Sequence, residues 1–263
     1  MGLHQTDAFI LRTYPLAEAH KICVLLTRDS GLIRGVAHGA RRLKSRFGAS
    51  LEPFTEIHLT YYEKEGRELV RVSNCDIIRS HFLQASKTEI AAALSYITEL
   101  LCEFLPAHEP NERLYRLVLA SLEALETDTP ATATTTTTVY LDSLLRYFEI
   151  WLLKLSGFFP DLQTCVSCNQ PIETGEGVWL AADGTPQCYK CSGGRGTGIG
   201  NELKRTLTMM LQYRPSAFAA AAKPYEHLAA IGEISYRLIR RILERDLRSY
   251  TLMNQVQAEM RRG

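Results

Sequence analysis

The sequence lacks any hydrophobic run long enough to cross a membrane. No apolar stretch approaches the roughly 18 residues that a membrane-spanning helix needs. The opening residues, Met1 to Asp7, are polar and do not resemble a secretory signal peptide. The cysteines number seven, an odd count that disfavours a disulfide framework and favours a reducing compartment. We therefore expect a cytoplasmic protein with no membrane partner.

The sequence also lacks the motifs of common catalytic sites. It contains no phosphate-binding loop, no G-x-S-x-G and no H-E-x-x-H. Its histidines are dispersed over positions 4, 20, 38, 58, 81, 108 and 227. The glycines of G-L-I-R-G and H-G-A-R-R have no strand-to-helix context of the kind that binds nucleotides. No acidic cluster indicates a nuclease, so we predict that the protein is not an enzyme.

Four of the seven cysteines have the spacing of a metal site. Cys165 and Cys168 form C-V-S-C, and Cys188 and Cys191 form C-Y-K-C after a gap of 19 residues. The intervening segment is rich in turn-forming residues, so it can fold back and bring the two pairs together. Four thiolates in a tetrahedron favour zinc and leave no open coordination position. The sequence predicts one structural zinc ion per chain.

Charge of one sign does not dominate the chain. The formal net charge is +1, but its distribution is uneven. Residues 1–80 carry 12 Lys/Arg against 9 Asp/Glu, residues 81–160 carry 5 against 10, and residues 161–263 carry 13 against 10. Basic ends that flank an acidic middle indicate separate binding faces.

The first third of the sequence predicts a small β-barrel. Its β-strand patterns are separated by turn signals such as R-D-S-G and K-E-G-R. In 21–27, apolar residues occupy both faces, as in a strand of a barrel wall. An OB-type barrel fits five strands of this length, although an SH3-like barrel remains an alternative. The expected strands cover residues 6–14, 21–27, 32–37, 55–63 and 68–73.

A basic run interrupts these strands. Between Ser30 and Leu51 the sequence has five cations and no acid. Clustered cations neutralise phosphates, which favours nucleic acid over a merely solvated loop. Nearby Phe47 and Phe54 can stack on bases, but we interpret them as plugs of the barrel. The predicted DNA-binding residues are Arg34, Arg41, Arg42, Lys44 and Arg46.

The remainder of the chain, apart from the cysteine segment, has mainly helical periodicity. A threonine-rich stretch, 127–138, predicts a loop or a poor helix start. In the final predicted helix, four arginines share one face, which fits either intrahelical ion pairs or an anionic partner. These are Arg237, Arg241, Arg245 and Arg248. Helices are expected near residues 87–105, 112–125, 139–155, 202–213 and 231–249.

Three segments of the sequence carry a family resemblance. The first is T-R-D-S-G-L-I-R-G-V-A-H-G-A-R-R-L-K-S (27–45), followed by L-E-P-F-T (51–55). The second is Y-F-E-I-W-L-L-K-L-S-G-F-F-P-D-L-Q-T-C-V-S-C (147–168), and the third is the second cysteine pair. In these motifs and in their order the chain resembles the RecO family of bacterial DNA repair proteins. The hairpin at 16–20, L-A-E-A-H, departs from the family pattern.

The resemblance implies a fold and a set of partners. It implies an OB-type barrel followed by an α-helical domain with an inserted zinc module, although some family members lack the zinc cysteines. It implies a non-enzymatic mediator that binds single- and double-stranded DNA, anneals complementary strands and loads RecA together with RecR. It also implies binding of the acidic C-terminal tail of single-strand-binding protein, for which Arg237 and Arg241 are candidate contacts.

The alternative function is a zinc-ribbon scaffold for protein contacts that does not bind DNA. For either function we expect four segments. They are a DNA-binding barrel at 1–80, a first helical part at 81–160, a zinc-binding module at 161–195 and a second helical part at 196–263.

Overall fold

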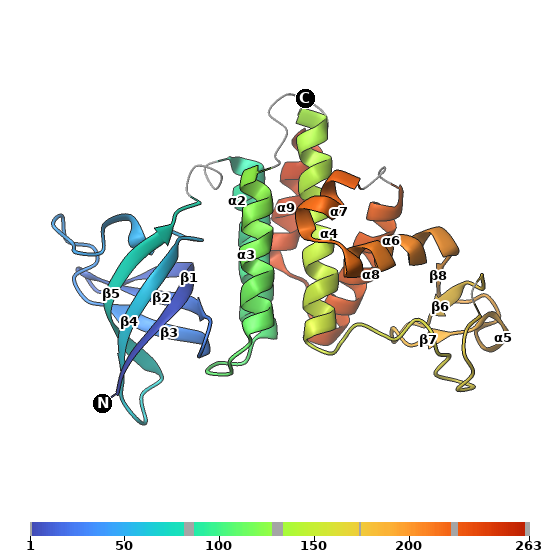
Figure 1. Cartoon of the computed structure of the whole chain (residues 1–263), viewed down its shortest axis with the longest axis horizontal. Coiled ribbons are helices and arrows are strands. Elements are labelled where there is room, and N and C mark those ends of the chain that lie inside the picture. The colour runs from blue at the N-terminus through green and yellow to red at the C-terminus, as the bar shows by residue number, and fades with distance from the viewer. Residues whose placement is uncertain (1, 82–86, 128–133, 174, 222–225, 261–263) are drawn as a thin grey trace. The chain divides into compact units, whose positions relative to one another are not determined.

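The computed structural model describes residues 2–81, 87–127, 134–173, 175–221 and 226–260. These residues divide into two compact units (Figure 1). Unit 1 comprises Met1–Leu122 with Thr251–Val256, and unit 2 comprises Glu123–Tyr250 with Gln257–Gly263. In the described part of the chain, no helix is both long and apolar enough to span a bilayer.

Unit 1 begins with the predicted five-stranded OB-like sheet. Neighbouring strands pair in the order β1-β2-β3-β5-β4, and β4 pairs back with β1 to close a barrel. The β3–β5 pair is parallel and the other pairs are antiparallel. All five expected strands are therefore confirmed. The strands are β1 (Gly2–Leu16), β2 (His20–Thr27), β3 (Gly31–Ala37), β4 (Glu56–Glu63) and β5 (Leu69–Arg79).

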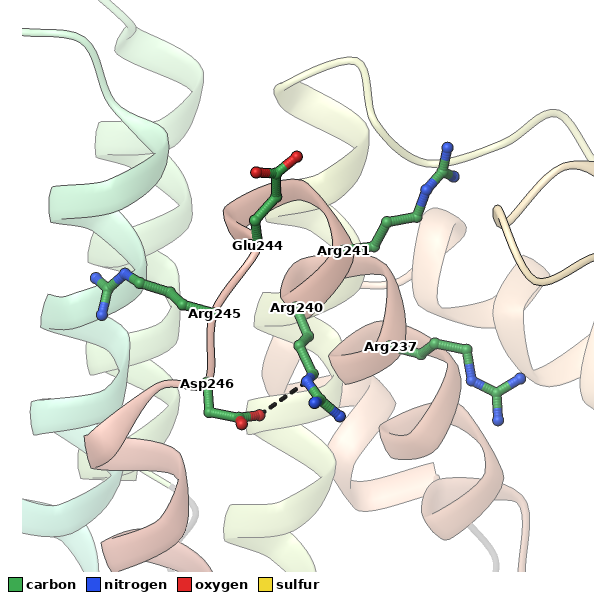
Figure 2. Close-up of a pocket in the computed structure, with 6 residues that line it drawn as sticks. All are labelled: Arg237, Arg240, Arg241, Glu244, Arg245 and Asp246. Atoms are coloured by element: carbon green, nitrogen blue, oxygen red, sulfur yellow. Dashed lines mark ion pairs between the residues drawn. The ribbon is translucent and has the colours of Figure 1, made fainter.

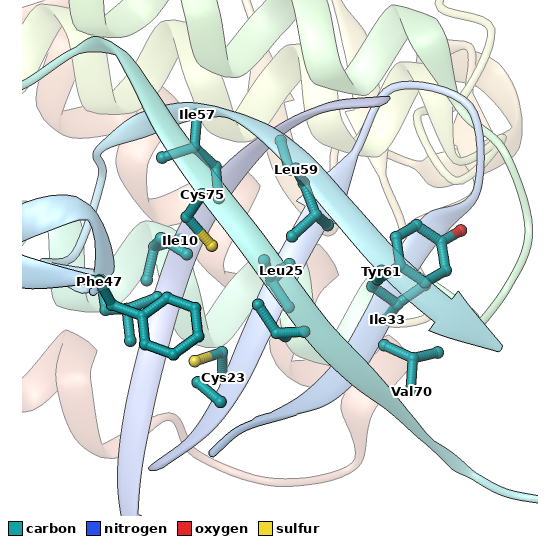
Figure 3. Packing of buried hydrophobic residues seen from close by; sticks show 14 residues of the cluster. Ile10, Cys23, Leu25, Ile33, Phe47, Ile57, Leu59, Tyr61, Val70 and Cys75 are labelled. Carbon is teal, nitrogen blue, oxygen red and sulfur yellow. The ribbon is translucent and has the colours of Figure 1, made fainter. Parts of the chain in front are cut away.

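Alternating residues of these strands fill the barrel (Figure 3). On β2, Cys23 and Leu25 belong to this core, while Val24 and Leu26 are buried on the opposite face. This confirms the prediction that both faces of the strand are packed. The ring of Phe47, which precedes the short 3-10 helix η1 (Gly48–Leu51), also enters the core. Phe54 is buried too, so neither of these rings is free to stack on bases.

Two helices contact the barrel within unit 1: α2 (Thr88–Phe104) and the part of α3 (Glu112–Thr127) up to Leu122. Thr98 of α2 donates a hydrogen bond to the carbonyl oxygen of Leu11 at 3.4 Å. The hydroxyl of Tyr115 on α3 donates to the carboxylate of Glu56 at 3.0 Å. The amide oxygen of Asn111 accepts from the backbone N–H of Leu114, as a helix cap does. The two predicted helices are thus confirmed.

Unit 2 is built around α4 (Thr134–Leu155), which packs against α7 (Pro215–Ala221) and α8 (Glu226–Leu243). The indole N–H of Trp151 donates to the carbonyl of Met210 on α6 (Asn201–Gln212) at 2.8 Å. Gly157 follows α4 with a φ of 77°, a conformation that favours glycine and ends helices. Within the threonine-rich stretch, α4 begins at Thr134, and residues 128–133 lie outside the described residues.

A buried ion pair within α4 is linked to α8 by a hydrogen bond. The guanidinium of Arg146 donates to both carboxylate oxygens of Glu149 at 2.8 Å. The hydroxyl of Ser235 on α8 donates to the same carboxylate. Gly232 leaves room for Arg146, because a Cβ there would lie 3.0 Å from its guanidinium nitrogen. The arrangement holds two helices together inside unit 2.

The predicted single helix over 231–249 is wrong. Helix α8 ends at Leu243, Glu244 has a φ of 54°, and a new helix, α9 (Arg248–Met260), begins four residues later. The rings of Tyr236 and Tyr250 stack at 3.6 Å across the break, and Leu247 is fully buried. These contacts favour a change of direction that helical periodicity does not reveal. The four arginines therefore do not share one face of one helix.

Candidate metal centre and nucleic-acid interface

Two backbone turns present the paired cysteines in unit 2. In the first, the backbone N–H of Asn169 donates to the carbonyl of Cys165 at 2.9 Å, and Asn169 has a φ of 55°. In the second, Cys188 caps the short helix α5 (Tyr189–Ser192), and the N–H of Ser192 donates to its carbonyl. Each turn is closed by a backbone hydrogen bond, and within each turn the two thiols lie close together.

A small sheet brings these turns together. Its strands β7 (Pro186–Gln187), β6 (Val178–Leu180) and β8 (Thr197–Ile199) lie in that order. The N–H of Val166, in the first turn, donates to the carbonyl of Pro186 just before the second. Gly196, with a φ of 104°, lets the chain pass β6, because a Cβ there would lie 2.4 Å from the carbonyl oxygen of Leu180.

The four sulfur atoms form a cluster that can hold a metal ion. The ligand atoms of Cys165, Cys168, Cys188 and Cys191 all lie within 4.8 Å of one another. The Cys168 and Cys188 sulfurs are 4.0 Å apart, close to the separation of about 3.8 Å across a tetrahedral zinc–thiolate site. The four cysteines that the sequence singles out therefore lie together and could hold a metal ion.

The local electrostatics favour a thiolate at Cys165, the buried cysteine of the cluster. Burial opposes charge on Cys165, but hydrogen bonds from the backbone N–H groups of Cys188 and Cys168 overcome it and lower the pKa of this thiol to about 6. Hydrogen bonds with the Cys188 and Cys168 side chains raise the pKa of Cys191 to about 12. A divalent cation would remove the repulsion that keeps all four thiols from ionising together.

The predicted basic segment forms an exposed loop between β3 and β4 in unit 1. All five cations are exposed, and the barrel pairs β3 with β5 beneath them. The N–H of Gly39 donates to the ring of His20 at 2.9 Å, and the N–H of Arg41 donates to the carbonyl of Ala19. These bonds tie the loop to the β1–β2 hairpin. Arg34 lies on β3, and the loop itself carries Arg41, Arg42, Lys44 and Arg46.

Three of these cations have contacts of their own. Arg34 forms an exposed ion pair with Glu68 at 3.6 Å, a type worth little in water. Arg41 donates to the carbonyl of Ala17 at 2.9 Å. The guanidinium of Arg46 lies 4.9 Å from the ring centre of Phe47. Within the described residues, Arg42 and Lys44 have no side-chain hydrogen bond or ion pair.

Sequence reasoning missed a further cation beside this loop. Arg71 on β5 is exposed and lies opposite Val36 of β3. Desolvation and the charges of His20, Arg71 and Arg46 lower the pKa of His38. Arg71 and Arg46 therefore act on the same imidazole although 25 positions separate them in sequence. Only the parallel β3–β5 pairing reveals this neighbour.

A second concentration of arginine lies where α8 ends. A hollow of about 570 Å³ opens there (Figure 2), and we name it the arginine hollow. The Arg240 side chain pairs with the Asp246 carboxylate at 2.9 Å. The guanidinium groups of Arg237 and Arg241 extend to one side, and that of Arg245 extends to the other (Figure 2). The hollow is lined by Arg237, Arg240, Arg241, Glu244, Arg245 and Asp246.

The two predicted partner-binding arginines contact the cysteine module. Arg237 donates a hydrogen bond to the hydroxyl of Thr197 on β8. A Cβ on Gly184 would lie 3.2 Å from a guanidinium nitrogen of Arg241. Hydrogen bonds from Thr185 are the main cause of the lowered pKa of Asp183, and the positive charge of Arg241 lowers it further. Both arginines thus support the module whether or not they also bind a partner.

The fold and the sites together define a class of protein. An OB-like barrel with a basic loop precedes a helical unit that carries a four-thiol cluster able to hold a metal ion. Models for the N-terminal and C-terminal parts of recombination protein O match residues 1–81 and 86–251. The chain belongs to the RecO family of DNA repair proteins.

Individual relatives agree with this assignment. A protein of Koribacter versatilis named DNA repair protein RecO is 32% identical over 254 residues, which cover 97% of this chain and 99% of the relative. Proteins with the same name from Bifidobacterium adolescentis and Geobacter metallireducens are 36% and 28% identical. They cover 71% and 97% of this chain, and 76% and 98% of their own lengths.

Proposed function

We propose that this protein is a non-enzymatic recombination mediator that binds DNA through the β3–β4 loop of its barrel. The mediator anneals complementary strands and, with RecR, helps to load RecA onto strands coated by single-strand-binding protein. The family assignment supports the general role in DNA repair. The observation that carries the DNA site is the exposed basic segment between Ser30 and Leu51, which has Arg34 on β3, four cations in the loop and no acid.

The loop suits phosphates better than it suits another protein surface. Its cations are exposed, and two of them, Arg42 and Lys44, have no competing side-chain partner within the described ranges. Each phosphate contact releases condensed counterions, so binding weakens as salt rises. OB-type barrels commonly bind single strands, with a charged groove following the backbone. Because Phe47 and Phe54 are buried, base stacking on these rings is not part of the proposal.

A salt series tests the DNA site. Replacing both Arg42 and Lys44 by alanine removes two phosphate contacts. The negative slope of log K against log salt should therefore become shallower by about 1.4 on single strands. Alanine at Lys64 and Arg67, two exposed cations of the β4–β5 turn, is the matched control and should leave the slope unchanged. An unchanged slope in the loop variant would place the DNA site elsewhere, whereas absence of salt-dependent DNA binding by the wild-type chain would favour the scaffold function, in which the chain binds only proteins.

We further propose that the four cysteines hold one structural zinc ion. The ion would close the module by binding Cys165, Cys168, Cys188 and Cys191, and it would stabilise unit 2 without taking part in chemistry. The compact thiol cluster and the softness of thiolate ligands support zinc over magnesium or calcium. Localisation in the cytoplasm, at the nucleoid during repair, follows from the proposed role.

The arginine hollow is the proposed site for the acidic tail of single-strand-binding protein. Arg237 and Arg241 would pair with its carboxylates, and charge-assisted hydrogen bonds of this kind are the strong ones. Binding of a tail peptide to the full chain at low salt tests this role. A charge-reversing Arg241→Glu variant should bind several-fold less peptide than wild type. The control variant Arg205→Glu, on α6, should bind as much peptide as wild type. If both variants bind alike, the tail docks elsewhere.

The four-segment division remains part of the proposal. We place the DNA-binding barrel at 1–80, the helical parts at 81–160 and 196–263, and the zinc-binding module at 161–195.

A further inference from the structure

The basic loop carries one fully exposed apolar side chain. Leu43 lies between Arg42 and Lys44 and is 102% exposed. Among the large hydrophobic residues of the described chain, the next most exposed is Tyr189, at 59%. A single exposed leucine is common on protein surfaces, so the significance of Leu43 depends on its place among the cations of the loop.

The backbone displays this leucine in a fixed place. The N–H of Arg42 donates to the carbonyl of Gly39 at 3.1 Å, and the N–H of Ser45 donates to the carbonyl of Arg42 at 3.0 Å. These two bonds close turns immediately before and after Leu43. The contacts of Arg41 with Ala17 and Ala19 attach the turns to the β1–β2 hairpin. The backbone at Leu43 is therefore ordered before binding, so that only the rotamers of its side chain must be fixed when it binds.

The charges around Leu43 indicate what it meets. Cations precede and follow it directly, and the nearest acids along the chain are Asp29 and Glu52. This setting attracts a polyanion and disfavours a basic or neutral apolar surface. In a nucleic acid, the apolar partner that lies between rows of phosphates is the stack of bases.

We propose that Leu43 is a wedge that inserts between neighbouring bases when the loop binds DNA. Arg42 and Lys44 would contact phosphates on either side, while the leucine separates two stacked bases and buries its side chain between them. Aliphatic wedges of this kind unstack base steps in several classes of DNA-binding protein. The wedge rests on the proposed function, since it requires the loop to be the DNA site. It would expose base edges to an incoming complementary strand.

Fluorescence of 2-aminopurine tests the wedge, because stacking quenches this base. The full chain is titrated with an oligo(dA) that contains one 2-aminopurine. Wild-type protein should raise the fluorescence. Leu43→Ser should abolish the rise and weaken affinity roughly three- to tenfold, the loss expected for a partly buried leucine. Its salt slope should match wild type because no charge is removed.

Two further variants serve as controls. Leu43→Phe should retain the rise, because a ring also separates bases. Leu3→Ser removes another exposed leucine of the barrel, at 57% exposure, and should behave as wild type. Since Leu43 is fully exposed, its variants should unfold at the wild-type temperature.

The outcomes separate the wedge from the DNA site itself. If Arg42→Ala/Lys44→Ala lowers the salt slope but Leu43→Ser retains the full fluorescence rise, the loop binds DNA and the wedge is wrong. If the cation variant keeps the wild-type slope, the DNA site lies elsewhere and the wedge fails with it.

Discussion

The guanidinium of Arg41 donates a hydrogen bond to the backbone carbonyl of Ala17 at 2.9 Å. The backbone N–H of Arg41 also donates to the carbonyl of Ala19, at 3.1 Å. The basic loop is therefore attached to the β1–β2 hairpin. Arg41 has a structural role that its exposed neighbour Arg42 does not share.

Replacing Arg41 by alanine should affect the loop as well as DNA binding. We expect the negative salt slope to become shallower by about 0.7, as for loss of one phosphate contact on single strands. Loss of the bond to Ala17 should also speed amide hydrogen exchange at Arg41 and Ser45. Arg42→Ala should lower the slope equally but leave exchange at these amides unchanged. Equal exchange in both variants would show that the Ala17 contact does not hold the loop.

Metal analysis should find one zinc ion per chain. Cys168→Ser removes a ligand, so zinc content and the thermal stability of unit 2 should both fall. Cys102→Ser, a change at a cysteine outside the cluster, should retain one zinc ion. Absence of zinc from wild-type protein, with four thiols freely titratable, would rule out the metal site.

The buried barrel cysteines should be unreactive. Desolvation raises the pKa of Cys23 from 9.0 to about 11 and that of Cys75 to about 12. At pH 8 only on the order of one in a thousand of these thiols, or fewer, is ionised, and thiolate is the reactive form. A thiol reagent should therefore label them only after unfolding. Labelling of Cys23 in the native state would show that the barrel opens.

The same two thiols make barrel stability depend on alkaline pH. Their pKa values are higher in the folded state than the ordinary value of 9.0. Folding therefore favours the neutral thiol, and this contribution is complete below pH 9. It is lost as pH rises toward 11 and 12, because the unfolded chain releases these protons first. Denaturant unfolding of Cys23→Ala/Cys75→Ala should show a smaller decline of stability between pH 9 and 11 than wild type shows.

The ion pair between Arg146 and Glu149 should matter more than surface pairs do. Glu149 is fully buried, so Arg146→Met leaves its carboxylate without the guanidinium in a site of low dielectric. We expect a loss of about 3–5 kcal/mol in the free energy of unfolding. Arg205→Met breaks a pair whose partners are 74% and 66% exposed, and should cost about 1 kcal/mol or less. Similar losses in both variants would contradict the role of burial.

Much of the fold was predictable because its signals are local. Alternation along residues 21–27 and 55–63 reflects the two faces of a strand and predicted β2 and β4. The apolar period of residues 90–105, ended by Pro106, predicted α2 in the same way. The break after Leu243 was not predictable, because its sequence contains neither glycine nor proline. It depends on Tyr236 stacking against Tyr250, a contact between two helices.

The sequence by itself determined the two thiol pairs and the charge of the loop. Two CxxC turns place paired thiols by local geometry alone, and a run of cations without acids is basic in any conformation. Only the tertiary structure decided which loop residues are engaged. Arg41 donates a hydrogen bond to the carbonyl of Ala17, and Arg71 on β5 lies opposite Val36 of β3, next to the loop. Leu43 is fully exposed. Such relationships depend on the path of distant segments, and burial and hydrogen bonding exist only once that path has closed.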